Sequence, residues 1–234
     1  MLSVIFVTAQ SNKKSEVRLI NSNNENKIVG RIAEIIALRY GVHSSKAKQI
    51  RIAATLHDIG KKKIPDSILS KPGKLNKHEF ETIKSHTLLG AELLVNVQGE
   101  LGEMARACCL YHNEWFDGGG YWGRRFDDLP YYLPFVSIAD VYTALISKRP
   151  YKHAWVPAKA MQYIKSKSGT QFSPELVEVF ASLVRDDSCI SALFADIDAK
   201  QIHEIRRESN TIYRHGRLET KSRKSGNNAL QQPA

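Results

Sequence analysis

The sequence predicts an all-α domain. Apolar residues recur along most of the chain at the three- and four-residue spacing of amphipathic helices. Alternating apolar and polar runs of the kind that form strands are negligible. Glycines and prolines fall between the helical segments, where helices usually end. The 234 residues are 42% hydrophobic and 25% charged, which is ordinary for a globular chain that buries one core.

The first two predicted helices lead to an adjacent histidine and aspartate. A helix is expected at about Asn26–Tyr40, after a polar and asparagine-rich linker. A second helix begins near Ser44, and its apolar stripe is Ala47, Ile50, Ala54 and His57. His57 should therefore continue the buried face, Asp58 should lie beside it, and Gly60 should close the helix.

Two further helices each carry one histidine. Asn76, followed three residues later by a glutamate, resembles a capping box and starts a helix that runs to about Leu94. His86 lies on the flank of its apolar face. The next helix spans about Glu100–Asn113 and has a mostly apolar face made of Ala105, Cys108, Cys109 and His112.

Loops and three more helices complete the predicted domain. Residues 64–73 and the glycine-rich segment Asp117–Trp122 are expected to be loops, because three consecutive glycines do not form a stable helix. Pro134 opens a nearly all-apolar helix, Phe135–Ile146, which contains Asp140. The closing helices are expected at Ala158–Lys167 and Pro174–Val184.

The charge and the cysteines limit the class of protein. Of the formal charge of +10, residues 201–234 hold seven Lys and Arg against three Glu, so we expect a basic, disordered tail there. The moderately basic remainder suits an anionic substrate such as a phosphoester. We expect no specific nucleic-acid binding, because no helix interleaves basic and aromatic residues. Cys108 and Cys109 are adjacent, which argues against a disulfide framework and for a reducing, cytoplasmic location. No run approaches the roughly 20 apolar residues of a membrane helix.

Imidazoles and carboxylates recur on or beside the apolar faces of four predicted helices. They are His57 with Asp58, His86, His112 and Asp140. A buried carboxylate such as Asp140 costs several kcal/mol unless a cation or hydrogen bonds compensate it. A hydroxyl, a helix cap or an arginine could satisfy Asp140, and each histidine alone could be a core residue. Together, the residues favour a shared metal site.

The order and spacing of these residues resemble the HD-GYP family of metal-dependent phosphohydrolases. The matching segments are His57–Lys61, Ile64-Pro65, Lys71–Gly73, His86 with Gly90, His112–Tyr121, Leu129-Pro130, Ala139-Asp140, Arg149–Tyr151, Gly169–Phe172 and Pro174. The resemblance places this domain at residues 25–200, after an N-terminal extension (residues 1–24) and before the tail (residues 201–234). It implies a multi-helix bundle with a metal site in its core.

The family hydrolyses the bacterial second messenger cyclic di-GMP, and the resemblance assigns roles to several residues. Asp58 would bridge two metals, His57 and Asp140 would complete one, and His86 and His112 the other. The metals would be divalent, iron or manganese in the family pattern, with one or two ions bound here. A bridging hydroxide would attack phosphorus. The residues expected to contact the substrate phosphate are Lys61, Arg149 and Lys152, and Asp58 and Lys61 are the expected catalytic residues. The Asp117–Trp122 loop would contact a partner protein.

The chain departs from the family pattern at the metal site and at the signature loop. Ile28 and Asn113 stand where histidines are expected, and Trp122 stands where the signature has proline. Glu25 or Cys109 could supply a replacement ligand. Thr143 and Pro134 replace an aspartate and an arginine of the pattern. Two functions therefore stay open: a phosphodiesterase for cyclic di-GMP or a related nucleotide, and a non-catalytic module that binds the nucleotide or a signalling protein.

Overall fold

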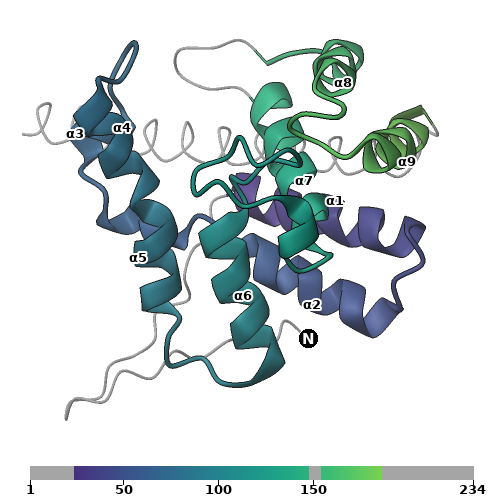
Figure 1. The fold of residues 1–234 in the computed structure, drawn as a ribbon, viewed down its shortest axis with the longest axis horizontal. Coiled ribbons are helices and arrows are strands. Elements are labelled where there is room, and N and C mark those ends of the chain that lie inside the picture. Colours follow the sequence, from purple (N-terminus) through teal and green to yellow (C-terminus); the bar gives the residue numbers. More distant parts are fainter. Residues whose placement is uncertain (1–23, 148–153, 186–234) are drawn as a thin grey trace, which may run out of the picture. The chain divides into compact units, whose positions relative to one another are not determined.

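The computed structural model describes residues 24–147 and 154–185, which are mostly helical (Figure 1). The chain divides into two units, Met1–Asp186 and Asp187–Ala234, and every described residue belongs to the first. The all-α prediction is confirmed, since the described part holds an isolated bridge between Ser168 and Phe172 but no strand. The predicted tail, and the predicted extension up to residue 23, lie outside the described residues. The domain boundaries stay predictions.

The described helices follow the predicted order. They are α1 (Asn24–Arg39), α2 (Ser44–Thr55), η1 (Ile59–Lys63), α3 (Asp66–Leu69), α4 (Lys77–Lys84), α5 (His86–Leu93), α6 (Gly99–Tyr111), η2 (Phe126–Asp128), α7 (Leu133–Ile146), α8 (Pro157–Ser166) and α9 (Pro174–Arg185). Helix α1 packs against α2 and α7, and α5 packs against α6 and η1 (Figure 1). Helix α2 also packs against α6, so α1, α2, η1, α5, α6 and α7 form one connected group.

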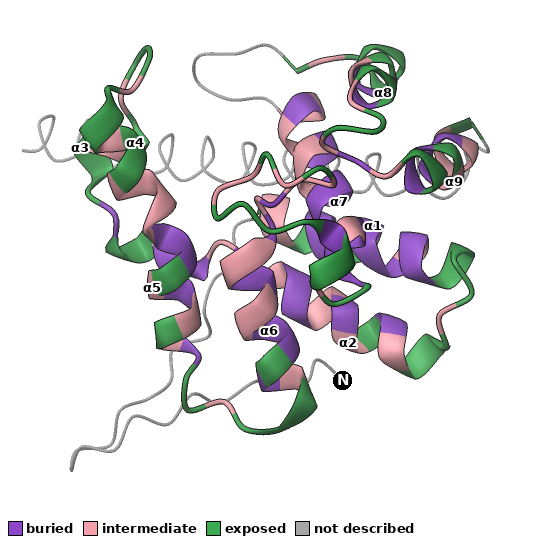
Figure 2. Ribbon diagram, viewed as in Figure 1, coloured by how far each residue is buried: buried purple, intermediate pink, exposed green. Residues whose placement is uncertain are grey.

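Helices α1 and α7 are the most deeply buried of these elements, as Figure 2 shows. The sequence of α7 is apolar on nearly every side, which is typical of a helix enclosed by its neighbours. Ile138 and Ala139 are fully buried immediately before Asp140. The core therefore positions the carboxylate of Asp140 from the protein interior. None of the described helices is both long and apolar enough to span a bilayer.

The predicted second helix, which ended at Gly60, is longer than the helix in the structure. Helix α2 ends at Thr55, and His57 and Asp58 lie in the turn that leads into η1. The reason is a close contact between η1 and α5. A Cβ atom at Gly60 would lie 2.0 Å from the carbonyl oxygen of His86 and 2.5 Å from the amide nitrogen of Gly90. Gly60 therefore permits backbone contact rather than simply closing α2.

The predicted helix from residue 76 to 94 is two helices, α4 and α5, separated at Ser85. Its capping box is confirmed: Asn76 accepts from the amide of Glu79 at 2.9 Å, and the Glu79 carboxylate accepts from the amide of Asn76 at 2.8 Å. At the junction, the hydroxyls of Ser85 and Thr87 donate to backbone carbonyls three residues earlier. Such local bonds compete with the helical pattern and favour a break there. The predicted loop at residues 64–73 also contains the short helix α3.

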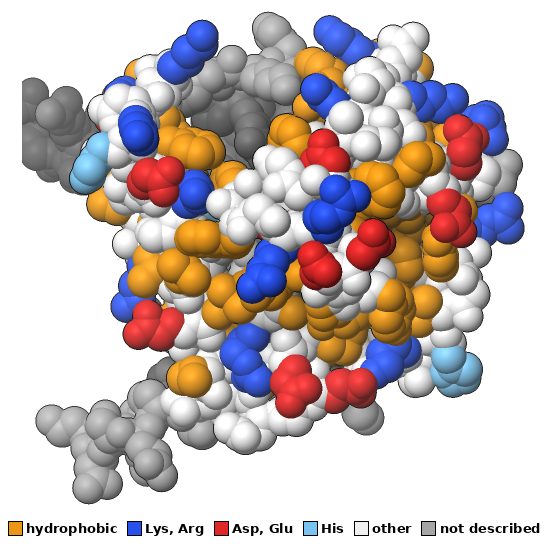
Figure 3. Space-filling model, in the orientation of Figure 1, with side chains coloured by type: hydrophobic (Ala, Val, Ile, Leu, Met, Phe, Trp, Pro, Cys, Tyr) orange, Lys and Arg blue, Asp and Glu red, His pale blue; other side chains and the backbone are white. Residues whose placement is uncertain are grey.

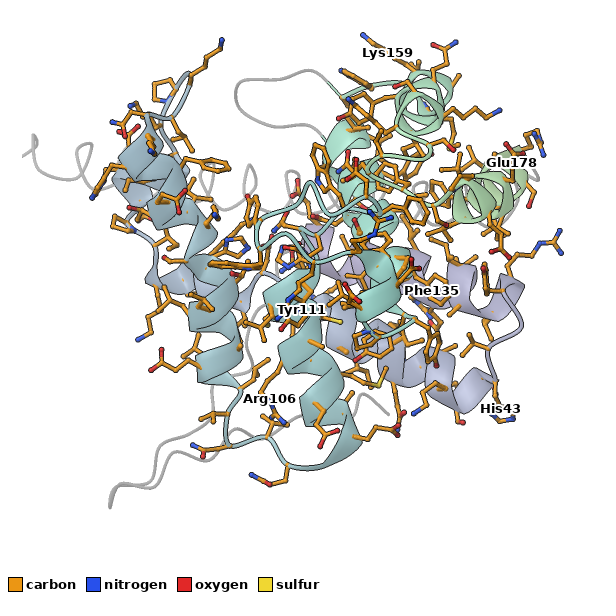
Figure 4. The ribbon with its side chains drawn as sticks, in the orientation of Figure 1. His43, Arg106, Tyr111, Phe135, Lys159 and Glu178 are labelled. Atoms are coloured by element: carbon orange, nitrogen blue, oxygen red, sulfur yellow. The ribbon has the colours of Figure 1, made fainter. Side chains whose placement is uncertain are left out.

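The connection between α5 and α6 is held by a side chain from α6. The guanidinium of Arg106 donates to the carbonyl oxygens of Leu94 at 3.0 Å and Val97 at 2.8 Å. Figure 4 labels Arg106 beside this connection. Leu94 caps α5 and Val97 lies in the connection that follows, so these bonds fix α6 relative to the end of α5.

Candidate metal centre

The five predicted metal ligands converge in the structure. They come from the turn after α2, the first residue of α5, the end of α6 and the middle of α7. They form two overlapping groups, one of His57, His112 and Asp140 and the other of Asp58, His86 and His112. Within each group the candidate ligand atoms lie within 4.8 Å of one another. This spacing suits atoms that share one cation.

Asp58 lies at the centre of the cluster. Its Oδ2 is 3.3 Å from Nε2 of His57, and its Oδ1 is 3.3 Å from Nε2 of His86 and 3.6 Å from Nε2 of His112. On the other side, Nε2 of His57 is 3.5 Å from Oδ1 of Asp140. The two oxygens of Asp58 therefore face different imidazoles. A carboxylate in this arrangement can bridge two metal ions.

Backbone carbonyls set the orientation of all three imidazoles. The Nδ1 contacts are His57 to the oxygen of Ala54 at 2.7 Å, His86 to that of Ile83 at 2.6 Å, and His112 to that of Cys108 at 2.9 Å. Because a carbonyl oxygen can only accept, each Nδ1 carries the proton in these bonds. Each Nε2 is then directed to the cluster with its lone pair available in the neutral ring. This is the usual arrangement of metal-binding histidines.

Two atoms of the cluster are buried without a hydrogen-bond partner. They are Nε2 of His57 and Oδ1 of Asp58. A buried polar atom without a partner costs about 1–3 kcal/mol, and more if it is charged. A divalent cation between these atoms would satisfy both. The donor set of imidazole nitrogens and carboxylate oxygens also fits such a cation.

The electrostatics of the cluster favour a positive charge at its centre. Burial lowers the pKa of His57, but Asp58 and Asp140 outweigh burial and raise that pKa to about 10. Burial, with His57 nearby, lowers the pKa of His112 to about 3. Burial opposes ionisation of Asp58, yet His57 and Lys61 hold the pKa of its carboxyl well below the usual range. The carboxylates thus stay ionised, as metal ligands must.

Among the predicted phosphate-contacting residues, Lys61 lies at the cluster. Its Nζ is 2.5 Å from Oδ2 of Asp58, and its side chain is 43% exposed. A lysine in this position has access both to the buried carboxylate and to solvent. The other two, Arg149 and Lys152, lie outside the described residues.

The departures from the family pattern have distinct structural consequences. Ile28 is an apolar core residue with 6% exposure. Asn113 places its Nδ2 at 2.7 Å from Nε2 of His112, so its amide competes for the atom that a metal would use. The thiol of Cys109 donates to the carbonyl of Leu56 at 3.3 Å, and burial raises its pKa to about 12. Neither ligand group found among the described residues contains Glu25 or Cys109.

Glu114 is an important residue that sequence reasoning missed. Its side chain is fully buried, and its two carboxylate oxygens accept from the backbone amides of Trp122 and Arg124, both at 2.7 Å. A Cβ atom at Gly120 would lie 2.4 Å from Cα of Glu114, so the loop packs directly on the backbone at this residue. An acidic residue just before a glycine-rich loop was the available sequence signal. Its partners are eight and ten residues further along the chain, beyond the reach of a helical pattern.

Comparisons with known proteins agree with this geometry. A family model described as HD domain matches residues 12–176. A cyclic di-GMP phosphodiesterase of Thermotoga maritima is 37% identical over 176 residues, which cover 75% of this chain and 48% of that protein. A 3'3'-cGAMP-specific phosphodiesterase 2 of Vibrio cholerae is 40% identical over 147 residues, which cover 62% of this chain and 28% of that protein. The chain thus matches half or less of the length of these relatives.

Solved structures share the fold. A HDG"Y"P protein from Bdellovibrio bacteriovorus aligns with a TM-score of 0.57 at 17% identity, over 70% of this chain and 53% of the other. A cyclic GMP-AMP-specific phosphodiesterase of V. cholerae aligns with a TM-score of 0.56 at 17% identity, over 72% of this chain and 45% of the other. The family match, the relatives and the sequence motifs lead to one conclusion. The chain belongs to the HD-domain family, as a member of its HD-GYP group.

Proposed function

We propose that this chain is a metal-dependent phosphodiesterase that hydrolyses cyclic di-GMP or a related cyclic dinucleotide. The observation that carries the proposal is the cluster around Asp58, in which three imidazoles and two carboxylates converge with two buried atoms unsatisfied. The curated relatives named as cyclic di-GMP phosphodiesterases support the substrate class. The moderately basic composition suits a substrate with two phosphodiester groups.

The proposed roles follow from the distances. His57, Asp140 and Oδ2 of Asp58 would hold one cation, and His86, His112 and Oδ1 of Asp58 would hold a second. Divalent cations supply charge for the phosphoryl oxygens and activate water for attack. Lys61 would orient the substrate phosphate, because its ammonium group lies at the outer oxygen of Asp58 and its side chain reaches solvent. Iron or manganese fits this mixed nitrogen and oxygen donor set.

The number of cations depends on His112. Its Nε2 belongs to both ligand groups, but one lone pair can bind one cation at a time. Asn113 also contacts this atom, so its amide must turn or move before His112 binds a metal. We therefore propose one strongly bound cation and a second that is bound more weakly.

The alternative function is a non-catalytic module that binds a cyclic dinucleotide or a signalling protein. The contact between Asn113 and His112 favours it, together with the apolar Ile28 in place of a ligand. An exposed Trp122 in the Asp117–Trp122 loop suits contact with a partner protein.

The buried thiols of Cys108 and Cys109 suit a reducing, cytoplasmic setting.

The deciding experiment measures metal content and product on the same sample. The chain is purified anaerobically without a chelating tag, supplied with manganese or ferrous iron, and incubated with cyclic di-GMP. We expect at least one ion per chain by elemental analysis, and release of linear dinucleotide or GMP. Asp58→Asn should abolish both, whereas Asp66→Asn, at an exposed aspartate of α3, should abolish neither.

Two results would change the conclusion. Metal-loaded protein that binds the nucleotide without turnover would establish the non-catalytic alternative. Protein that holds no metal under any of these conditions would refute the metal centre itself.

A further inference from the structure

Three aromatic side chains form a row that begins beside the metal centre. The ring of Tyr121 lies edge-to-face with the ligand His86, with 6.4 Å between their centroids. Phe80, from α4, lies edge-to-face with Tyr121 at 5.7 Å. Trp122 follows Tyr121 in the loop. We call Phe80, Tyr121 and Trp122 the aromatic row.

Lys84 contacts two members of the aromatic row, Tyr121 and Trp122. Its Nζ lies 4.9 Å from the ring centroid of Trp122 and 5.9 Å from that of Tyr121. Only 16% of its side chain is exposed, so the cation is held against the rings rather than extended into solvent. Cation–π contacts of this kind fix the relative positions of α4 and the loop.

The Asp117–Trp122 loop is also held in place by contacts with Glu114. Glu114 accepts from the backbone amide of Trp122, and Gly120 packs directly on the backbone of Glu114. These contacts involve the main chain, so they hold the loop whatever side chain stands at residue 122. The aromatic row is therefore preorganised, which lowers the entropic cost of binding a ligand.

The outer members of the row are exposed. Phe80 is 42% exposed and Trp122 is 39% exposed, so each leaves a large part of an aromatic side chain open to solvent. Hydrophobic side chains intermingle with Lys and Arg on the molecular face that Figure 3 shows. The cation that lies against the ring of Trp122 is Lys84, whose Nζ is also 3.5 Å from Oε2 of Glu81. Exposed rings beside a lysine suit a flat ligand that carries negative charge.

We propose that Phe80 and Trp122 bind a nucleobase of the cyclic dinucleotide by stacking, and so determine how the substrate is positioned. The inference rests on the proposed function, which brings a phosphodiester to the metal centre. Tyr121 connects the candidate metal centre to the exposed rings, since it contacts both the candidate metal ligand His86 and the exposed Phe80. A base attached to that phosphodiester can then reach the row. Every base has a π face, and stacking on an aromatic side chain contributes about 1–3 kcal/mol per base, or roughly 5- to 150-fold in affinity.

The test is calorimetric binding of a hydrolysis-resistant phosphorothioate analogue of cyclic di-GMP to the manganese-loaded chain. Phe80→Ala and Trp122→Ala should each raise the Kd about tenfold. Trp122→Phe keeps a ring and should restore the affinity to within about twofold. The matched control is Tyr131→Ala, because Tyr131 is a 55% exposed aromatic residue that packs instead on Tyr132 and Phe135. It should leave the Kd unchanged.

A second ligand separates stacking from a general loss of binding. The corresponding cyclic ribose phosphodiester without bases should bind the wild type and Trp122→Ala equally. An unchanged Kd for the dinucleotide in both alanine variants would overturn the stacking proposal and leave the proposed function intact, with a partner protein as the reason for the exposed Trp122. A wild type that binds neither ligand would overturn both proposals.

Discussion

The candidate metal centre and the neighbouring Asp117–Trp122 loop are built in opposite ways. In the metal centre, His57 and His112 are buried with Nδ1 bonded to a backbone carbonyl in the preceding turn. In the loop, a buried side chain, Glu114, binds backbone amides eight and ten residues later. The centre thus uses main chain to orient side chains, and the loop uses a side chain to orient main chain.

In the proposed function, this difference separates the residues that would bind the cations from those that would recognise the nucleotide. The candidate ligands would have to keep fixed positions to share cations, and they lie on helices or on short turns packed against helices. The loop must present rings to solvent, so its rigidity has to come from a buried anchor rather than from its own burial. Substitutions in the two regions should therefore differ in what they disturb.

The largest effect is expected from Gly60→Ala. The new Cβ would lie 2.0 Å from the carbonyl oxygen of His86, so η1 and α5 must separate. We expect the free energy of unfolding to fall by about 3 kcal/mol. Metal affinity should fall about 10- to 100-fold, because the turn holding His57 and Asp58 moves away from His86. Urea unfolding and metal titration measure the two effects.

A contrary result for Gly60→Ala would be informative. If the variant kept its metal affinity while losing stability, the ligands would be positioned independently of the contact between η1 and α5. The helical core would then contribute stability but not the geometry of the centre.

The sequence predicted which side chains converge in the candidate metal centre but not how the loop is held, for a physical reason. His57, His86, His112 and Asp140 lie on or beside apolar stripes with helical spacing, which the sequence shows directly. The end of α2 was missed because the constraint on Gly60 comes from α5, which is about 25 residues away in the chain. Glu114 was missed for a similar reason, since its amide partners become visible only when the loop folds back. The family resemblance supplied the roles of the ligands, and spacing alone did not.

An intermediate effect is expected from Glu114→Ala. The backbone amides of Trp122 and Arg124 lose a charged acceptor, and hydrogen bonds to charged groups contribute about 1.5–3 kcal/mol each. Because Trp122 and Arg124 are exposed, water can replace part of the lost acceptor, and we expect the free energy of unfolding to fall by about 2 kcal/mol in total. Nucleotide affinity should fall about tenfold, with metal content unchanged. Glu114→Gln keeps one acceptor oxygen and should lie between the two. Glu103→Ala, at an exposed glutamate of α6, is the control and should change stability by less than about 0.5 kcal/mol.

The metal content of Glu114→Ala tests whether Glu114 stabilises only the loop. Loss of metal from Glu114→Ala, at a denaturant concentration where the variant is folded, would show that the loop also holds the centre together. The separation between chemistry and recognition would then be wrong.

The smallest effect is expected from Asn76→Ala, which removes the cap of α4. The helix loses the acceptor for the amide of Glu79, at a cost of about 1 kcal/mol. Because α4 carries Phe80 and Lys84 but none of the five candidate ligands, any functional change should appear in nucleotide affinity and not in metal affinity. Calorimetry with manganese and with the phosphorothioate analogue measures both quantities on one preparation. A fall in metal affinity equal to the fall in nucleotide affinity would show that α4 acts through α5 and His86, and would join the two regions into one cooperative unit.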